Sequence, residues 1–368
     1  MRVLFLNWRD LSHPQGGGSE RYVEQLASWL ASDGDDVIIQ CAAHSDAPPF
    51  ETRDGVRYYR RGGRFTVYPY GLMAVRRHRP DVVVDVSNGV PFFTPLVHRR
   101  VVLVIHHVVN QETWSESFGP LLSRIGWFIE TRLVRLVYRR ARYVAVSGPT
   151  RDDIVALGVE PERVTVVHNA TDPAPVLPVR DTQVRQNVLA VVARLVAHKR
   201  VDHAVEVVAR LADEFPDLRL RIVGDGPDRA HILGRADELG VADRVDLLGA
   251  VDDATKHEVL AGAAVLLCPS VKEGWARVVM EAAAHQVPTV GYRSSGGLRE
   301  SVLDGQTGLL ADGVDDLAKL AGDLLRDPAR RAAMGLAAYQ HAASFTPQRT
   351  LAEFRTVLGE TEVSNDVR

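Results

Sequence analysis

The chain is poor in cysteine and in lysine, and each shortage excludes something. Its two cysteines, Cys41 and Cys268, lie in separate apolar runs, without a CxxC partner or metal-ligand spacing. We therefore expect buried thiols in a reducing compartment rather than a disulfide or a zinc site. Lysine occurs four times in 368 residues, and arginine supplies the rest of the positive charge. A lysine in a loop is therefore a candidate for a specific task.

Long apolar runs and a large net charge are also missing. No apolar run reaches the roughly 18 residues of a transmembrane helix, and Met1–Arg9 has too short an apolar core for a signal peptide. The net charge of −3 gives no bulk attraction to nucleic acid. Residues 1–180 carry 22 arginines against 19 acidic residues, whereas the remainder has a net charge of −6. We expect a cytoplasmic protein whose N-terminal half meets any anionic surface or acceptor.

Short β-branched runs alternate with helical patterns, which is typical of parallel α/β sheets. The expected strands are Val3–Leu6, Val37–Cys41, Val82–Val86, Val101–Ile105, Tyr143–Val146, Val164–Val167, Val188–Val192, Leu218–Val223, Val245–Leu248, Val265–Cys268 and Thr289–Gly291. The clearest expected helices are Ser19–Ala31 and Asp202–Glu214, with a last helix over Gln348–Leu358.

A proline-rich break divides the alternation into two halves. Three prolines fall between Asp172 and Pro178, and a polar stretch follows. We read 1–172 as one domain, 173–187 as a linker and 188–346 as a second domain. Two doubly wound domains are expected to meet at a cleft lined by the carboxyl ends of their strands.

The most informative stretch runs from Pro269 to Ala282 and places Glu273 and Glu281 eight residues apart. A buried strand is expected before it, and a glycine turn and a helix start lie between the two carboxylates. Backbone N–H groups at such a helix start suit a phosphate, and carboxylates suit hydroxyls, so the stretch fits a nucleotide sugar. The alternative is a surface glutamate followed by another on the polar face of a helix.

Further loops add candidates in the second half. Arg194 and Lys199 leave its first strand and can place two cations on one phosphate group, or simply form a solvated basic loop. Gly224 ends another strand and either packs a nucleotide or forms a tight turn. The glycines of Ser294–Glu300 again precede a helix and offer backbone amides.

In the first half, Gly16, Gly17 and Gly18 come before a helix, where backbone can approach a diphosphate closely. The segment is neither GxGxxG nor a P-loop, and a flexible loop is the alternative. His106 ends an apolar strand and can accept a proton or bond a sugar or phosphate oxygen; we take His107 as a structural neighbour.

Basic residues cluster in the helical stretch Arg132–Arg142, and also in Arg76–Arg79 and His98–Arg100. Such a surface can lie on anionic lipid, which would place the protein peripherally at the inner membrane face. A solvated helix face is the other interpretation.

With these motifs in order, the chain resembles the retaining glycosyltransferases of the GT-B fold in glycosyltransferase family 4. The resemblance rests on VARLVAHKR, LRIVGDGPDR, VDLLGAVDD, LLCPSVKEGWARVVMEAAA and GGLRESVLDGQTGLLA, with GGGSE, VLVIHH, VSGPTRDDI and VVHNATD before them. It implies two Rossmann-like domains facing a central cleft, an N-terminal acceptor domain and a C-terminal donor domain. It also implies that residues 347–368 cross back to the N-terminal domain.

The resemblance also implies roles for single residues. Arg194 and Lys199 match the basic pair that holds the donor diphosphate, and Gly17 and Gly18 match the loop that approaches it. Glu273 and Glu281 match the EX7E motif, the first beside the donor sugar and the second at the ribose. His106 matches a histidine near the transferred sugar. The donor-binding positions implied by the motifs are Gly17, Gly18, Gly224, Gly274, Trp275, Ala276, Arg277 and Glu281.

Three residues depart from the family pattern. Ala276-Arg277 stands where glycine and an apolar residue are usual, and His198 stands where a polar residue such as Glu is usual. The implied reaction transfers a hexosyl group from a UDP- or GDP-sugar to a hydroxyl of a glycan, lipid-linked or small-molecule acceptor, without metal or other cofactor. Alternatives are a sugar-nucleotide epimerase or glycoside phosphorylase on the same fold, and a non-catalytic nucleotide-sugar-binding protein.

Overall fold

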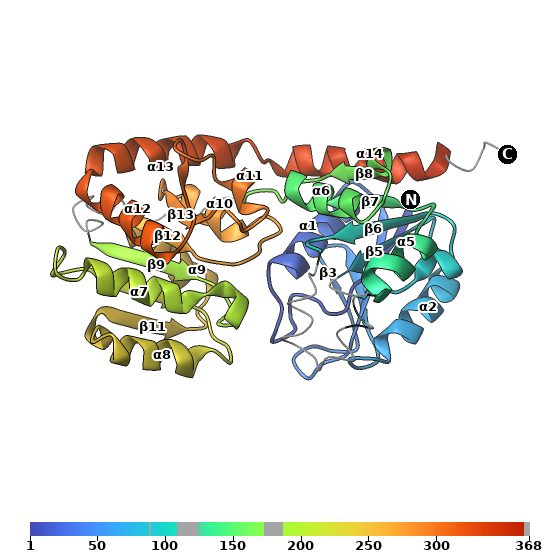
Figure 1. Cartoon of the computed structure of the whole chain (residues 1–368). Helices are drawn as coiled ribbons and strands as arrows, with labels where there is room; N and C mark the ends of the chain where they lie inside the picture. The colour runs from blue at the N-terminus through green and yellow to red at the C-terminus, as the bar shows by residue number, and fades with distance from the viewer. Residues whose placement is uncertain (88–89, 109–123, 125, 127, 173–186, 364–368) are drawn as a thin grey trace. The chain divides into compact units, whose positions relative to one another are not determined.

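The computed structural model describes residues 1–87, 90–108, 124, 126, 128–172 and 187–363. The chain forms two compact units (Figure 1). Unit 1 comprises Met1–Ala170 and Pro347–Arg368, and unit 2 comprises Thr171–Thr346. The expected linker, 173–187, lies outside the described residues except for its last residue.

Unit 1 is built on an eight-stranded sheet in the order β3-β4-β2-β1-β5-β6-β7-β8. Its strands are β1 (Arg2–Leu6), β2 (Asp36–Cys41), β3 (Phe50–Arg53), β4 (Val56–Arg60), β5 (Val82–Ser87), β6 (Val101–Ile105), β7 (Arg142–Ala145) and β8 (Val164–Val166). All neighbouring pairs are parallel except β3 with β4. The central strands are buried on both faces, because helices cover both sides of the sheet.

Among its described residues, unit 1 has the α-helices α1 (Gly18–Ser32), α2 (Val67–His78), α5 (Val134–Val137), α6 (Gly148–Ala156) and α14 (Pro347–Val363). Helices α2, α5 and α6 contribute to one apolar cluster on the sheet. Helices α1 and α14 contact each other, and Phe354 of α14 stacks on Phe5 of β1 at 6.2 Å between ring centroids. The basic helix expected over Arg132–Arg142 ends earlier: α5 follows a π turn at Ile129–Leu133 and stops at Val137, and β7 begins at Arg142.

The hairpin of β3 and β4 was not expected. Its strands are short and strongly polar, so they lack the apolar runs that mark the other strands. Asp54 and Gly55 connect them, and both have positive φ. An Asp-Gly pair between two strands is a strong hairpin signal, and it was available in the sequence.

Unit 2 carries a six-stranded parallel sheet in the order β11-β10-β9-β12-β13-β14. Its strands are β9 (Val188–Val192), β10 (Arg219–Val223), β11 (Val245–Gly249), β12 (Val265–Cys268), β13 (Thr289–Tyr292) and β14 (Gly308–Ala311). Its helices are α7 (Val201–Leu211), α8 (Arg229–Glu238), α9 (Asp253–Gly262), α10 (Arg277–Ala283), α11 (Leu298–Ser301), α12 (Val314–Arg326) and α13 (Pro328–Ala343). The prediction of two doubly wound α/β sheets is thus confirmed, although β14 was missed.

The order of the strands marks one position in each sheet. In unit 2 the chain starts at β9, adds β10 and β11 on one side and β12 to β14 on the other. Parallel sheets bind ligands beyond the carboxyl ends of the strands where this direction reverses. The loops after β9 and β12 flank that position, and they contain Lys199 and Glu273. In unit 1 the corresponding reversal lies at β1 and β5.

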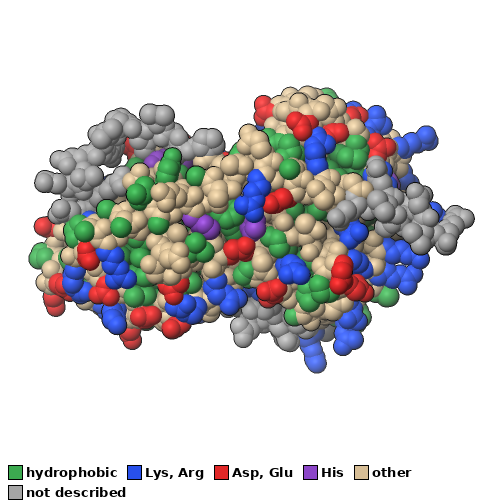
Figure 2. Space-filling model, turned by 90° about the horizontal axis from the view of Figure 1, so that it is seen from above, with side chains coloured by type: hydrophobic (Ala, Val, Ile, Leu, Met, Phe, Trp, Pro, Cys, Tyr) green, Lys and Arg blue, Asp and Glu red, His purple; other side chains and the backbone are tan. Residues whose placement is uncertain are grey.

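Surface and core agree with the composition. Cys41 and Cys268 are buried and not disulfide-bonded, and burial raises the pKa of both thiols, that of Cys268 to about 12. On the face that Figure 2 shows, acidic and basic side chains are interspersed. No helix in the described part of the chain is both long and apolar enough to cross a membrane.

Candidate active site

The loops at the carboxyl edge of the unit 2 sheet hold one another through their backbones. The N–H of Val271, after β12, donates to the carbonyl of His198, after β9, at 2.9 Å. The N–H of Glu273 donates to the carbonyl of Ser295 at 3.1 Å, and the carbonyl of Glu273 accepts a hydrogen bond from the N–H of Gly297 at 2.9 Å. The strand ends therefore fix the backbone on which the candidate side chains sit.

Glycine makes this close packing possible. A Cβ on Gly224 would lie 1.9 Å from the carbonyl oxygen of Ala193, and a Cβ on Gly297 would lie 1.9 Å from that of Gly274. No side chain fits at either distance. A glycine is therefore needed at position 224 for the close contact between the loops after β9 and β10. This contact accounts for Gly224 without any contact to a nucleotide.

Lys199 and Glu273 form the central pair of the site. The Lys199 Nζ lies 2.6 Å from Oε1 of Glu273, and each side chain retains some exposure, 18% and 14%. Burial would raise the pKa of the Glu273 carboxyl, but the Lys199 ammonium and hydrogen bonds from Lys199 and Ser270 outweigh it and hold the pKa below its ordinary value. Glu273 is therefore ionised at neutral pH and acts as a hydrogen-bond acceptor.

Arg194 belongs to the same cluster. Its side chain is exposed, and its charge acts on His198. Burial, together with the positive charges of Lys199 and Arg194, lowers the pKa of His198 to about 4. His198 is thus neutral, and Arg194 and Lys199 supply two cations within electrostatic reach of one side chain.

Glu281 lies on α10 and has a cationic partner of its own. Lys256 of α9 places its Nζ 3.1 Å from Glu281 Oε2 and 3.0 Å from Asp253 Oδ1. Glu273 and Glu281 therefore each pair with a lysine, and three of the four lysines of the chain, Lys199, Lys256 and Lys272, stand at this edge. Sequence reasoning found Lys199 but missed Lys256, although the rarity of lysine was a usable signal.

The turn between Glu273 and α10 is unusual in its backbone. Ala276 adopts a left-handed backbone conformation, with φ 61° and ψ 66°, which residues other than glycine rarely adopt. Arg277 follows as the first residue of α10 and forms an ion pair with Asp172 at 2.7 Å. Trp275 is buried in the same turn. Sequence reasoning singled out this turn but did not find Asp172.

In unit 1 the glycine loop is hydrogen-bonded to the buried carboxylate of Glu20. None of Gly16, Gly17 and Gly18 has a positive φ. The N–H of Gly17 donates to Oε2 of Glu20 at 2.8 Å, and Arg9 lies 3.0 Å from the other oxygen of that carboxylate. The loop before α1 is therefore anchored from within the helix.

His106 stands at the end of β6, beside α1. It is 7% exposed and meets the ring of Tyr22 edge to face, with ring centroids 5.5 Å apart. Burial lowers its pKa to about 4, and the opposing charge of Glu20 is too weak to reverse this. Its Nε2 has no hydrogen-bond partner among the described residues, so it is a neutral group with an unused donor or acceptor. His107, in contrast, is exposed.

An ion-pair cluster lies in the same unit, at the ends of β1, β2 and β4. Arg60 is fully buried and contacts Asp10 at 2.6 Å and Glu51 at 2.6 Å. Ser12 and Asp10 both approach the same nitrogen of His44, Nε2, at 3.3 and 3.1 Å. A Ser-His-Asp triad needs opposite imidazole nitrogens, so this cluster is no nucleophilic site.

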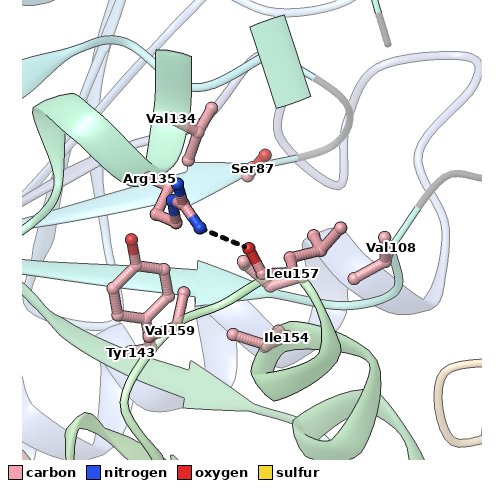
Figure 3. Close-up of a pocket in the computed structure, with 9 residues that line it drawn as sticks. Ser87, Val108, Val134, Arg135, Tyr143, Ile154, Leu157 and Val159 are labelled. Atoms are coloured by element: carbon pink, nitrogen blue, oxygen red, sulfur yellow. Dashed lines mark hydrogen bonds between the residues drawn. The ribbon is translucent and has the colours of Figure 1, made fainter. Parts of the chain in front are cut away.

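A small cavity lies elsewhere in unit 1 (Figure 3). Mostly apolar side chains line it, and Arg135 reaches across to the carbonyl of Leu157 at 3.5 Å. Its volume of about 20 Å³ has room for roughly one water. It cannot hold a sugar nucleotide. Within the described ranges, no three His, Cys, Asp or Glu side chains gather as metal ligands.

The structure thus groups the candidates by unit. Arg194, Lys199, Glu273 and Glu281 share the edge of unit 2 with the turn 274–277. Gly17, Gly18 and His106 belong to unit 1, where Glu20 links the glycine loop to the surroundings of His106.

Comparison with known proteins now identifies the family. Residues 179–341 match the family described as glycosyl transferases group 1, and residues 16–175 match glycosyltransferase family 4. The D-inositol 3-phosphate glycosyltransferase of Corynebacterium diphtheriae is 35% identical, over 94% of this chain and 90% of that protein. A GDP-mannose-dependent alpha-(1-6)-phosphatidylinositol monomannoside mannosyltransferase of Mycolicibacterium smegmatis is 34% identical, over 65% of this chain and 64% of that protein.

Among solved structures, the sucrose-phosphate synthase of Thermosynechococcus elongatus superimposes with a TM-score of 0.82, over 99% of both chains at 18% identity. At that identity the match speaks for the fold alone, and it agrees with the two doubly wound sheets described above. The chain belongs to glycosyltransferase family 4 and is a glycosyltransferase of the GT-B fold.

Proposed function

We propose that the protein transfers a hexosyl group from a nucleoside diphosphate sugar to an acceptor hydroxyl, with retention of the anomeric configuration. The observation that carries the proposal is the accessible Lys199–Glu273 pair at the point where the strand order of unit 2 reverses. A diphosphate needs cations, and sugar hydroxyls need hydrogen-bond acceptors. The Lys199 ammonium offers the first and the Glu273 carboxylate the second, 2.6 Å apart.

The electrostatics of the pair suit departure of a nucleoside diphosphate. Negative charge develops on the leaving phosphate, and Arg194 and Lys199 are in place to stabilise it. Glu273 is ionised and tied to Lys199, which favours a role in holding the sugar over a role as proton donor. We propose a front-face displacement, in which an oxygen of the donor phosphate accepts the proton of the attacking hydroxyl. No metal ion takes part in this scheme, because the two cations carry the charge.

His106 and Glu281 complete the assignment. A neutral His106 with an unused Nε2 can exchange a hydrogen bond with a sugar or acceptor hydroxyl, but it is not an acid at neutral pH. Glu281 would accept hydrogen bonds from the ribose hydroxyls, and the ion pair with Lys256 would orient its carboxylate.

Both relatives are named for inositol-containing acceptors, and one of them is named for GDP-mannose. We therefore propose an acceptor that contains inositol or its phosphate, and GDP-mannose as the first donor to test. UDP-sugars are the alternative, since Arg194, Lys199 and Glu273 do not distinguish the nucleobase.

A lipid-linked acceptor would require contact with a membrane, and α2 offers a surface for it. Tyr70 and Met73 are exposed along the helix, Phe65 is exposed just before it, and Arg76 and Arg77 lie in its last turn. Exposed apolar side chains beside arginines favour anionic lipid. Sedimentation with anionic vesicles, and its loss in the Arg76→Ala/Arg77→Ala double variant, tests this contact; equal sedimentation of both proteins contradicts it.

The reaction itself is tested by incubation with GDP-mannose, UDP-glucose or UDP-N-acetylglucosamine, with and without inositol phosphate or phosphatidylinositol. We expect acceptor-dependent release of nucleoside diphosphate, insensitive to EDTA, and a product whose anomeric configuration by NMR matches that of the donor. Release without acceptor and an epimerised sugar would indicate an epimerase. Dependence on inorganic phosphate would indicate a phosphorylase, and binding without turnover a non-catalytic protein.

A further inference from the structure

The turn between Glu273 and α10 is fastened to both ends of unit 2. Arg277 Nη2 donates to Asp172 Oδ2 at 2.7 Å, and the two side chains are only 11% and 21% exposed. Asp172 is the second residue of unit 2. Arg277, one of the three residues that depart from the expected motif, therefore holds the segment through which the chain enters this unit.

The end of unit 2 reaches the same turn. The ring of Phe345, one residue before the last of the unit, meets Trp275 edge to face with centroids 4.7 Å apart. Thr171 ties the two ends together: its N–H donates to the carbonyl of Phe345 at 2.8 Å, and its hydroxyl donates to that of Ala342 at 2.8 Å. The two end segments of unit 2 are thus hydrogen-bonded to each other, and Trp275 and Arg277 each contact one of them.

Ala276, between these two anchors, carries the left-handed backbone of the turn. A non-glycine residue in this region stays there only when its surroundings hold it, because the conformation is unfavourable by itself. Trp275 and Arg277 flank Ala276 and are both held by residues distant in the chain. The contacts with Phe345 and Asp172 are therefore well placed to maintain the geometry of the turn.

Asp172 is also close to the far end of the candidate donor site. Burial and Lys256 lower the pKa of His257, whereas Glu281, Asp253 and Asp172 act in the opposite direction. His257 in turn contacts His285, Nδ1 to Nε2, at 2.8 Å. The Asp172 carboxylate thus lies within electrostatic reach of α9, which supplies the lysine partner of Glu281.

We propose that Asp172 is a positioning residue for donor binding, which acts through Arg277 to hold the turn that carries Glu273. This inference rests on the proposed function, since it takes the turn to be part of the donor site. Coupling between two sites is reciprocal. Asp172 therefore strengthens donor binding, and a bound donor strengthens the contacts of Thr171 and Asp172.

A competing arrangement makes the opposite prediction. If Arg277 itself bound the donor diphosphate, Asp172 would compete for its guanidinium, and loss of the Asp172 charge would free Arg277 and tighten binding. The sign of the change in affinity therefore separates positioning from competition.

The test compares Asp172→Asn, Asp172→Glu and the control Asp246→Asn by calorimetric titration of the full chain with the nucleotide sugars GDP-mannose, UDP-glucose and UDP-N-acetylglucosamine. Asp246 lies on β11, an edge strand of the unit 2 sheet, and β14 forms the other edge. Its carboxylate pairs with Arg219 at 2.6 Å. For the nucleotide sugar that binds the wild type, we expect Asp172→Asn to weaken affinity about tenfold. Asp172→Glu should largely restore it, and Asp246→Asn should leave it unchanged.

Hydrogen exchange gives a second readout that a general loss of stability would not reproduce. In the wild type, the bound nucleotide sugar should slow exchange in peptides covering 168–172 and 342–346. In Asp172→Asn that protection should shrink, while the free variant unfolds at the wild-type temperature. Unchanged or tighter binding by Asp172→Asn overturns the inference, as does a loss that Asp172→Glu fails to restore. If the wild type binds none of these nucleotide sugars, the proposed function itself fails.

Discussion

Both units place a close ion pair at the carboxyl edge of their sheet, and the two pairs differ in exposure. In unit 1, Arg60 and Asp10 lie 2.6 Å apart with both side chains fully buried. In unit 2, Lys199 and Glu273 are also 2.6 Å apart, but both reach the surface. A pair that solvent cannot reach stabilises the fold, whereas a reachable pair can exchange its partner for a ligand. Exposure, not distance, separates the structural pair from the candidate functional one.

The largest effect should come from breaking the buried pair. Asp10→Ala leaves the buried Arg60 guanidinium with Glu51 as its remaining acidic partner. Loss of one partner of a buried pair typically costs about 3–5 kcal/mol. Urea unfolding followed by circular dichroism should show this loss in unit 1. The matched variant Asp46→Ala, at an exposed residue in the same region, should leave the unfolding midpoint unchanged. An equally small change in the unfolding midpoint of both variants would show that burial does not determine what the Arg60–Asp10 pair contributes to stability.

Breaking the accessible pair should instead affect activity. Lys199→Ala removes a cation from the leaving phosphate, and loss of one preorganised charge donor typically lowers kcat by about 100- to 1000-fold, or roughly 3–4 kcal/mol. The unfolding midpoint should change little. Lys319→Ala, at an exposed lysine of α12, is the control and should keep full activity. Wild-type turnover of the donor by Lys199→Ala would remove Lys199 from the mechanism.

Local signals explain why so much of unit 2 was predictable. Strands β9 and β12 are continuous apolar runs. The loop after β9 contains the rare Lys199, the loop after β12 contains Glu273, and Glu281 follows on α10. The parallel α/β pattern then places such loops at one edge. The prediction of two doubly wound sheets was confirmed on the same basis, because alternating strand and helix patterns are read within short windows.

Long-range pairs explain what could not be predicted. Arg277 and Asp172 are 105 residues apart, and nothing in either neighbourhood indicates the other. The same holds for Arg60 with Asp10, which required the unexpected strand β4 to bring Arg60 to the end of β1. Sequence motifs therefore indicated which loops carry chemistry, but not which side chains hold those loops in place.

A smaller effect should follow from the neutral histidine of unit 1. His106 has a folded pKa of about 4 against an ordinary 6.5, so the unfolded chain binds more protons between these values. Stability is therefore lost as the pH falls from 6.5 towards 4, by about 2 kcal/mol at pH 5. His106→Gln should flatten this acid slope in urea unfolding between pH 7.5 and 5. His231→Gln, at a largely exposed histidine, should keep it; an unchanged slope in His106→Gln would contradict a neutral His106.

The smallest effect should come from an ion pair that is short but exposed. Arg326 contacts Glu214 through two nitrogens, at 2.5 and 2.7 Å, yet the two side chains are 45% and 47% exposed. Water and salt screen such a pair, and ordering two long side chains offsets its attraction. Glu214→Gln should leave both the urea midpoint and donor turnover within error of the wild type. A loss of stability close to that of Asp10→Ala would mean that geometry, and not burial, decides what an ion pair contributes in this protein.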